Sequence, residues 1–262
     1  MKYYIGIDLG GTNIVAGVVN ESYEILAKAS VKTNLPRPEE EIAADMAKVS
    51  KEAAEQAGLT MADIEWIGVG TPGVANSATG VIEYSNNLGF HNTPMVKYLE
   101  TALGKPTFIE NDANAAAIGE MTYGAARGMK DFIVITLGTG VGSGIVIGGN
   151  LVYGHDGFAG ELGHVIMRRN NGRPCGCGRQ GCLETYASAT GVARTAREYL
   201  EIRKDESVLR DLDPDEITSK DVFDAAMKND KLALEIFEFT GNILGEAFAD
   251  AVAFSSPEAI IL

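Results

Sequence analysis

The residues with the most distinctive chemistry are three cysteines, Cys175, Cys177 and Cys182, which share the stretch "RPCGCGRQGC" at 173–182. The 262-residue chain has no other cysteine. Redox chemistry, an iron–sulfur cluster and zinc could each explain such crowding, but neither the C-x-x-C redox motif nor a fourth thiolate is present. His164, 11 residues before Cys175, would complete the Cys3His ligand set of a structural zinc site. We therefore expect zinc to hold a glycine-rich loop.

Two carboxylates flank this loop. Glu161 precedes His164 in "GELGH", and Glu184 follows Cys182 in "CLE". Each is either a solvated loop residue or a fixed acceptor for ligand hydroxyl groups. A neutral polyol, such as a sugar, is the ligand that several such acceptors would bind.

A further acidic residue follows a strand in "TFIENDANAAAIGEM". Asn111 and Asp112 stand between an apolar strand and an Ala-rich helix, where either could be a helix N-cap. Alternatively, Asp112 reaches the crevice at the carboxyl ends of the strands, where α/β proteins bind ligands. There it could act as a general base, because phosphoryl transfer needs only a carboxylate that orients a hydroxyl and accepts its proton late.

Two glycine-rich turns follow strands of similar design. They comprise Gly10, Gly11 and Thr12 in the first turn and Gly138, Thr139 and Gly140 in the second. Such turns either close tight hairpins or let backbone amides approach a phosphate. Asp8, at the mouth of the first turn, is either a turn former or a carboxylate that holds the water shell of Mg²⁺.

The elements that must position these residues alternate between strand and helix. We expect hairpins at 3–19 and 132–152, strands at 64–70 and 106–110, and a closing strand in "PEAIIL". We expect helices at 39–57, 93–103, 113–125, 184–201, 219–228 and 230–253. The charged segment 203–218 is expected to be a solvated connection. This order predicts an α/β protein with a small N-terminal lobe at 1–112 and a larger C-terminal lobe with the zinc loop at 113–262.

Charge and hydropathy exclude several classes of partner. With 22 Lys and Arg against 36 Asp and Glu, the net charge is −14, so a nucleic-acid backbone is not an expected partner. No apolar run is long enough to span a membrane, and no export signal precedes the first strand. An odd cysteine count without such a signal indicates the cytoplasm.

The motifs "DLGGTN", "GTPG", "ENDANAAAIGE", "LGTGVGSG", "GELGH" and "CGCGRQGCLE" occur in this order, and with them the chain resembles bacterial glucokinases of the Repressor, Open reading frame, Kinase (ROK) family. The resemblance runs from the first strand to residue 262. It implies a two-lobed RNase H-like fold of the actin, hexokinase and heat-shock protein superfamily. It also implies a homodimer that transfers phosphate from Mg²⁺-bound ATP to the 6-hydroxyl of a hexose, with glucose giving glucose 6-phosphate.

The resemblance also implies roles for single residues. Asp112 matches the family's catalytic base, and the matching sugar ligands are Asn111, Glu161, His164 and Glu184. His164 would bind zinc through one ring nitrogen and a sugar hydroxyl through the other. Gly73 of "GTPG" and Asn86 of "YSNNLGF" match residues that line the sugar pocket, and the two glycine turns match the phosphate-binding loops.

Two departures from the family pattern bear on these expectations. Repressors of the family carry a DNA-binding helical extension before the first strand, which here begins at residue 3. The family also continues beyond "IIL" into a Gly-rich turn that holds adenosine, so we expect the C-terminal part of the fold to be missing here. A kinase for N-acetylmannosamine, N-acetylglucosamine or fructose and a non-catalytic, sugar-responsive regulator remain the alternative functions.

Overall fold

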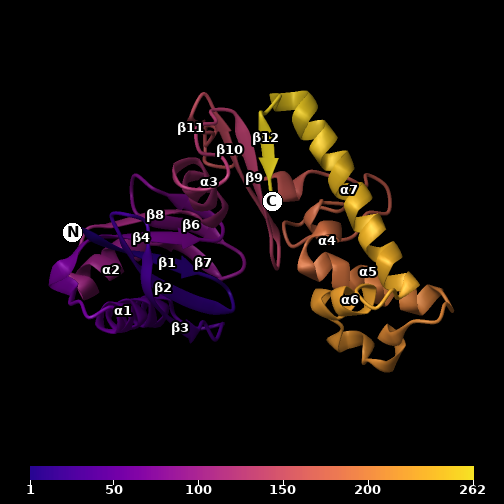
Figure 1. Cartoon of the computed structure of the whole chain (residues 1–262), viewed down its shortest axis with the longest axis horizontal. Helices are drawn as coiled ribbons and strands as arrows, with labels where there is room; N and C mark the ends of the chain where they lie inside the picture. Colours follow the sequence, from indigo (N-terminus) through magenta and orange to yellow (C-terminus); the bar gives the residue numbers. More distant parts are fainter. The chain divides into compact units, whose positions relative to one another are not determined.

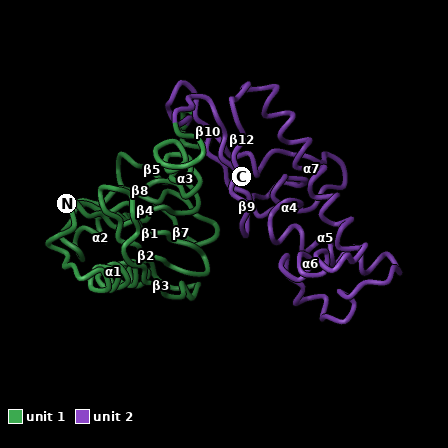
Figure 2. The backbone as a smooth tube through the Cα atoms, in the orientation of Figure 1, with its two compact units in different colours: residues 1–127, 153–159 green, residues 128–152, 160–262 purple.

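The structure is a computed structural model that describes residues 1–262, which form two compact units (Figure 2). Unit 1 comprises Met1–Arg127 and Tyr153–Ala159, and unit 2 comprises Gly128–Val152 and Gly160–Leu262. The division after residue 127 differs from the expected boundary after residue 112. The reason is that α3 (Asp112–Thr122) packs on strands of unit 1.

Unit 1 contains a five-stranded sheet in the order β3-β2-β1-β4-β8. Its strands are β1 (Tyr3–Leu9), β2 (Asn13–Asn20), β3 (Ile25–Lys32), β4 (Ile64–Thr71) and β8 (Thr107–Asn111). Strands β1, β2 and β3 are antiparallel neighbours, so the expected hairpin at 3–19 has a third strand. Strand β1 is parallel to β4, and β4 is parallel to β8, as in an α/β protein.

The two faces of this sheet differ because side chains alternate along each strand. In β1, Ile5, Ile7 and Leu9 are buried in the core, whereas Gly6 and Asp8 on the other face are exposed. Helices α1 (Glu39–Gln56) and α2 (Met95–Leu103) pack beside this sheet (Figure 1). Their buried apolar residues belong to that core. Asp8 therefore lies on the face away from α1.

A second, three-stranded sheet of unit 1 was not anticipated. Its strands are β5 (Val74–Asn76), β6 (Val81–Ser85) and β7 (Phe90–Thr93), in the order β5-β6-β7. A short 3-10 helix, η1 (Met61–Asp63), precedes β4. The small sheet carries the "GTPG" and "YSNNLGF" motifs at its ends.

Unit 2 contains a four-stranded sheet in the order β11-β10-β9-β12. Its strands are β9 (Phe132–Leu137), β10 (Val141–Ile147), β11 (Asn150–Leu151) and β12 (Ala259–Ile261). The expected hairpin at 132–152 is present, and the closing strand β12 pairs in parallel with β9. The 3-10 helix η2 (Leu162–His164) follows β11 in the chain.

The rest of unit 2 is helical, with α4 (Glu184–Ala187), α5 (Ala189–Ile202), α6 (Ser219–Ala226) and α7 (Lys231–Ser255). The expected helix at 184–201 is interrupted at Ser188, where the backbone is extended. Ser188 is the N-cap of α5, because its side-chain oxygen accepts a hydrogen bond from the Gly191 N–H. Most residues of the expected solvated connection at 203–218 are exposed, but the segment is not a simple connection. That segment forms η3 (Val208–Asp211) and η4 (Pro214–Glu216), and Leu209 and Ile217 are buried in the helical core.

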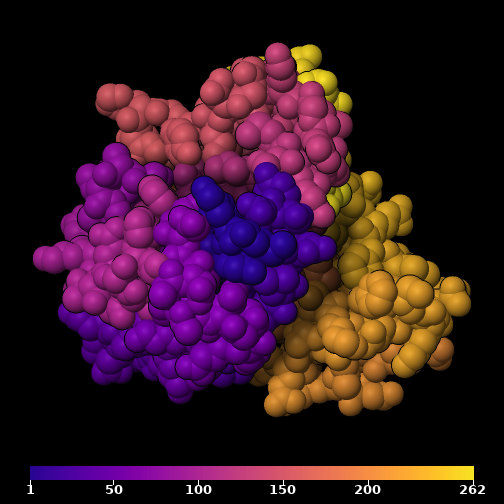
Figure 3. All heavy atoms as spheres, turned by 60° about the vertical axis from the view of Figure 1, so that its left-hand side comes forward, coloured from indigo at the N-terminus to yellow at the C-terminus, as the bar shows by residue number.

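No helix has both the length and the apolar character needed to cross a membrane. The first residues of the chain, drawn in indigo in Figure 3, lie at the surface.

Candidate active site and metal centre

The strand-to-helix junction after β8 positions Asp112. Asn111 is the N-cap of α3, because its side-chain oxygen accepts hydrogen bonds from the N–H groups of Ala113 and Asn114 at 3.0 and 3.1 Å. Its amide nitrogen donates to the Gly73 carbonyl at 3.0 Å. Capping is thus the task of Asn111, and Asp112, which is exposed as a residue, occupies the first turn of the helix. One amide N–H of Asn111 is left for a ligand.

Asp8 lies close enough to Asp112 to influence it. Asp8 pairs with Gly70 in the sheet register, and a Cβ atom at Gly70 would lie 3.6 Å from the Cα of Asp112. Neither carboxylate forms an ion pair with a basic side chain. Although part of the Asp112 residue is exposed to solvent, the protein atoms around its carboxylate desolvate that group and raise its pKa above the ordinary value. The Ala113 N–H opposes this shift, and the charge of Asp8 raises the pKa further. Desolvation also raises the pKa of Asp8.

A carboxylate with a raised pKa is a stronger proton acceptor than an ordinary aspartate. The pair combines such an acceptor, Asp112, with a second oxygen donor, Asp8, at the mouth of the first glycine turn. That arrangement suits a hydroxyl nucleophile at one carboxylate and a hard cation at the other.

Glu110, which was not among the predicted site residues, holds this junction together. Its Oε1 accepts hydrogen bonds from the Asn111 N–H at 2.8 Å and from the Asn114 amide at 3.2 Å. Its Oε2 accepts from Ser77 at 3.1 Å and from the Tyr153 hydroxyl at 2.8 Å. Burial and this carboxylate raise the pKa of Tyr153 to about 12. Glu110 thereby fastens the segment 153–159 to unit 1.

Gly73 and Asn86 lie at the ends of the small sheet. Gly73 has φ of +93°, and a Cβ atom there would lie 2.2 Å from the Tyr84 carbonyl oxygen. Only glycine fits such a position. Asn86 is exposed, and its side-chain oxygen accepts a hydrogen bond from the Tyr84 hydroxyl at 3.3 Å.

The first glycine turn, Gly10 to Thr12, connects β1 and β2. Buried Thr33 fastens it by donating its hydroxyl to the Gly10 carbonyl at 2.6 Å and its N–H to the Thr12 carbonyl at 3.0 Å. A Cβ atom at Gly10 would lie 2.9 Å from the Asn13 carbonyl oxygen, which explains the glycine.

The second glycine turn lies in unit 2 and is tied to α5. Gly138 donates its N–H to the Gly140 carbonyl at 3.0 Å and accepts at its own carbonyl from the Ala189 N–H at 2.8 Å. The Thr190 hydroxyl donates to the Thr139 carbonyl at 2.9 Å. The turn therefore lies beside a helix N-terminus, where anions are favoured.

Glu184 connects this turn to the cysteine loop. Its Oε2 accepts a hydrogen bond from the Val141 N–H at 3.1 Å, and its Oε1 lies 3.8 Å from the Cys175 sulfur. A Cβ atom at Gly140 would lie 2.3 Å from the Glu184 carboxylate, so the glycine makes room for it.

The structure brings together the four predicted metal ligands, His164, Cys175, Cys177 and Cys182, with their ligand atoms all within 4.8 Å of one another. His164 Nδ1 lies 3.6 Å from the Cys175 sulfur, and the sulfurs of Cys177 and Cys182 lie 3.7 Å apart. In a tetrahedral zinc site with Zn–S bonds of about 2.3 Å, two sulfurs are about 3.8 Å apart. The spacing of these atoms therefore fits zinc.

Cys177 is the most acidic of the three thiols. Burial opposes its ionisation, but hydrogen bonds from the backbone and guanidinium of Arg179 lower its pKa to about 6. Burial raises the pKa of Cys175 to about 12. Arg179 also donates to the His164 carbonyl at 3.0 Å, which joins the two ends of the ligand set.

The segment that bears Glu161 and His164 is held against β10. Gly163 approaches the Val141 carbonyl so closely that a Cβ atom would lie 2.1 Å from that oxygen. The His164 N–H donates to the Glu161 carbonyl at 3.0 Å. Because His164 turns Nδ1 toward the sulfur, Nε2 is left for another partner.

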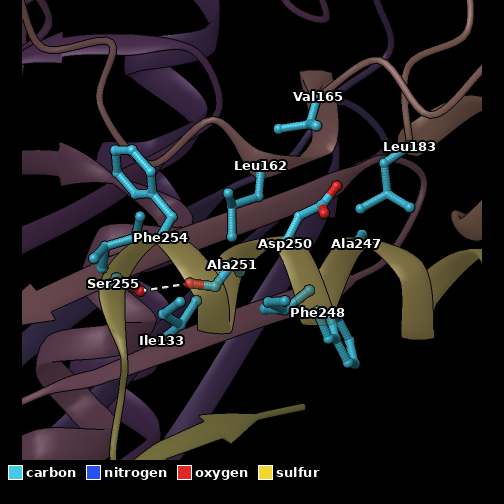
Figure 4. Close-up of a pocket in the computed structure, with 12 residues that line it drawn as sticks. Ile133, Leu162, Val165, Leu183, Ala247, Phe248, Asp250, Ala251, Phe254 and Ser255 are labelled. Carbon is cyan, nitrogen blue, oxygen red and sulfur yellow. Dashed lines mark hydrogen bonds between the residues drawn. The ribbon is translucent and has the colours of Figure 1, made fainter.

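An apolar pocket of about 320 Å³ lies under this segment and next to α7 (Figure 4). Leu162, Val165 and Leu183 line it from the cysteine-loop side, and Phe248 and Phe254 line it from α7. The dashed line in Figure 4 is the hydrogen bond from the Ser255 hydroxyl to the Ala251 carbonyl, 2.8 Å. None of the predicted site residues lines this pocket, so it has no part in the candidate chemistry.

Comparison with known proteins identifies the class. Residues 4–262 match the ROK family, and the chain belongs to that family. The glucokinase of Halalkalibacterium halodurans is 38% identical over 262 residues, which cover 100% of this chain and 79% of that protein. The N-acetylmannosamine kinase of Salmonella newport is 34% identical over 197 residues, covering 75% of this chain and 65% of that protein.

A solved structure supports the assignment to the ROK family. The ROK family glucokinase of Streptomyces griseus, crystallised in complex with glucose and AMPPNP, matches with a TM-score of 0.87 and 36% identity, covering 98% of this chain and 81% of that one. The predicted fold class, the RNase H-like fold of the actin and hexokinase superfamily, is thereby confirmed.

Proposed function

We propose that this protein, an ATP-dependent sugar kinase of the ROK family, transfers the γ-phosphate of ATP to the 6-hydroxyl of glucose with Asp112 as the general base. The observation that carries the proposal is the carboxylate pair of Asp8 and Asp112. Asp112 is exposed at the start of α3, is free of ion pairs and has a raised pKa. Such a carboxylate can orient a sugar hydroxyl and accept its proton as the bond to phosphorus forms.

Sugar binding would use both the Asn111 amide and the side chains of the cysteine-loop region. Glu161, Glu184 and the Nε2 of His164 offer acceptors and donors suited to several hydroxyl groups. The glucose-bound relative from Streptomyces griseus supports glucose as the ligand. Gly73 and Asn86 of unit 1 are further candidates for sugar contacts.

Zinc would be held by His164, Cys175, Cys177 and Cys182, whose spacing fits a tetrahedral site. Because all four positions would be occupied by protein ligands, the metal would fix the loop and have no open position for chemistry. It would also orient His164 through Nδ1, so that Nε2 faces away from the metal.

Mg²⁺ would enter with ATP, and Asp8 offers the carboxylate oxygen that such a hard cation prefers. When bound, the ion neutralises phosphate charge. The glycine turns at 10–12 and 138–140 would bind phosphate oxygens through backbone amides, the second with the help of the N-terminus of α5.

Other acceptor sugars are the main alternative within this reaction class. The N-acetylmannosamine kinase relative supports an N-acetylated hexose, and N-acetylglucosamine and fructose fit the same acidic and zinc-binding residues. A sugar-responsive regulator would bind sugar without turnover, and the accessible Asp112 carboxylate argues for the enzyme.

The test pairs turnover with binding in Asp112→Asn. We expect this variant to bind glucose in calorimetry within about threefold of the wild-type affinity and to lose roughly 10²–10⁴-fold in kcat. The matched control is Asp215→Asn, an exposed aspartate in η4 of unit 2. Near-normal turnover by Asp112→Asn would remove this residue from the role of base.

A further inference from the structure

Arg173 lies two residues before Cys175 and is the most completely bonded cation in unit 2. Its side chain is only 8% exposed. Its guanidinium has five N–H donors, and five contacts match them. Nε and Nη2 bind Glu198, Nη1 donates to the carbonyls of Thr185 and Gly191 at 2.8 and 3.4 Å, and Nη2 donates to Thr195 at 2.9 Å.

The partners of Arg173 belong to the elements that follow the cysteine loop. Thr185 lies on α4, one residue after Glu184, and Thr195 and Glu198 lie on α5. The guanidinium carbon also lies 4.6 Å from the centre of the Tyr186 ring, a cation–π contact. Helix α4 has only four residues, too few to be stable alone, so its position depends on such contacts.

The backbone of Arg173 also serves the loop. Its carbonyl accepts a hydrogen bond from the Gly181 N–H at 2.8 Å, next to Cys182, and its N–H donates to the Tyr186 hydroxyl at 3.0 Å. One residue therefore connects the start of the loop, the end of the loop and the helix that bears Glu184.

From these contacts we infer that Arg173 is a positioning residue, which fixes the Glu184 carboxylate and the cysteine ligands relative to each other before metal and sugar bind. The part of this inference that concerns Glu184 and sugar binding rests on the proposed function. The part that concerns the cysteines rests on the proposed zinc site. A lysine could not replace this arginine, because an ammonium group cannot supply five donors in one plane.

The experiment compares Arg173→Lys and Arg173→Met with the control Arg169→Met, which removes an exposed arginine from the same loop. We expect both Arg173 variants to weaken zinc binding in chelator competition by about 10- to 100-fold. We also expect the KM for glucose to rise at least tenfold, with kcat changing less than threefold. The control should match the wild type in both.

A folded Arg173 variant with a lower Tm but unchanged zinc affinity and unchanged KM would overturn the inference, because Arg173 would then be only a packing residue. If neither variant folds, Glu198→Gln supplies the test, since the Glu198 side chain is 42% exposed and should tolerate the change. It should shift zinc affinity and KM in the same directions by a smaller factor, and unchanged values would refute the inference.

The zinc readout separates this inference from the proposed function. Wild-type protein that shows no sugar-dependent turnover would contradict the kinase proposal, while zinc affinity in the variants would still decide the role of Arg173.

Discussion

At the scale of single residues, the proposed chemistry depends on two aspartates that stand at different places in the fold. Asp8 ends a strand, and Asp112 begins a helix whose cap is provided by its neighbour Asn111. Asp8 lies close enough to Asp112, across Gly70, for its charge to raise the pKa of Asp112. The structure thus places a potential proton acceptor beside a potential cation ligand without a basic side chain that would neutralise either one.

This coupling predicts a pH effect. The Asp8 charge raises the pKa of Asp112, so Asp8→Asn should lower that pKa and move the acidic limb of the profile of kcat/KM for glucose toward lower pH. The measurement is the pH profile at saturating Mg·ATP, with the matched control Asp131→Asn, since Asp131 precedes β9 and belongs to unit 2 rather than to the unit of Asp8 and Asp112. An acidic limb that stays in place, or moves to higher pH, would contradict the coupling.

Sequence analysis could group reactive residues into a site only where those residues lie close together in the chain. His164 and the three cysteines fall within 19 residues of chain, and their types alone indicated a common metal. Glu110 and Arg173 were missed because their partners lie far along the chain, with Tyr153 at a separation of 43 residues and Glu198 at 25. Nothing in the local pattern around either residue identifies such a partner.

At the scale of elements, the cysteine loop is held by the proposed zinc ligands on one side and by Arg173 on the other, and the ion pair of Arg168 with Glu246 ties its start to α7. Short bridges, Ile166 to Cys182 and Pro174 to Gln180, are the only strand-like pairing in the loop. A loop with so little regular structure needs such attachments to keep Glu161 and His164 in place.

The metal attachment can be tested by Cys177→Ser, which replaces a sulfur ligand by a hydroxyl. We expect zinc content to fall from one per chain toward zero and the KM for glucose to rise at least tenfold, because His164 loses its orientation. Metal analysis and steady-state kinetics measure both, and Asn170→Ser is the matched loop control. Unchanged zinc content together with unchanged sugar affinity would refute the coupling.

The small sheet of unit 1 predicts a stability effect. Gly73 has a positive φ and no space for a Cβ atom, so Gly73→Ala should destabilise the protein by about 1–3 kcal/mol or more. Gly241→Ala is the control, because Gly241 lies in α7 with nothing within 4 Å of a Cβ atom, and alanine there should stabilise by up to about 1 kcal/mol. Denaturant unfolding compares them. A Gly73→Ala variant as stable as the wild type would contradict the close approach to Tyr84.

At the scale of the whole molecule, elements with a clear apolar pattern were predictable, whereas β3 and the strands of the small sheet were not. Helix α7 and strand β8 have clear periodicity or apolar runs, and both lie within a few residues of their expected bounds. Strands β5, β6 and β7 have at most five residues each, which is too short for alternation to be recognised. Leu209 and Ile217 are single apolar residues in a charged stretch, so only tertiary packing reveals that they are buried.

The division into units depended on packing as well. The expected boundary followed Asp112, where a strand ends and a helix begins. Helix α3 nevertheless contacts β4 and β8, and the segment 153–159 is bonded to Glu110, so both belong to unit 1. Such contacts join residues that are distant in sequence, and the periodicity of the sequence does not reveal them.

The measurement that tests the central claim most directly is ADP release from Mg·ATP by the full-length gene product with glucose, N-acetylmannosamine, N-acetylglucosamine or fructose, and with no sugar. We predict rapid release with glucose, formation of glucose 6-phosphate in equal amount, and slow hydrolysis without sugar, because water is a poor substitute for the bound hydroxyl. Faster turnover with another of these sugars would contradict the choice of glucose. Glucose binding in calorimetry without ADP release from any sugar would contradict the kinase and favour a sugar-responsive regulator.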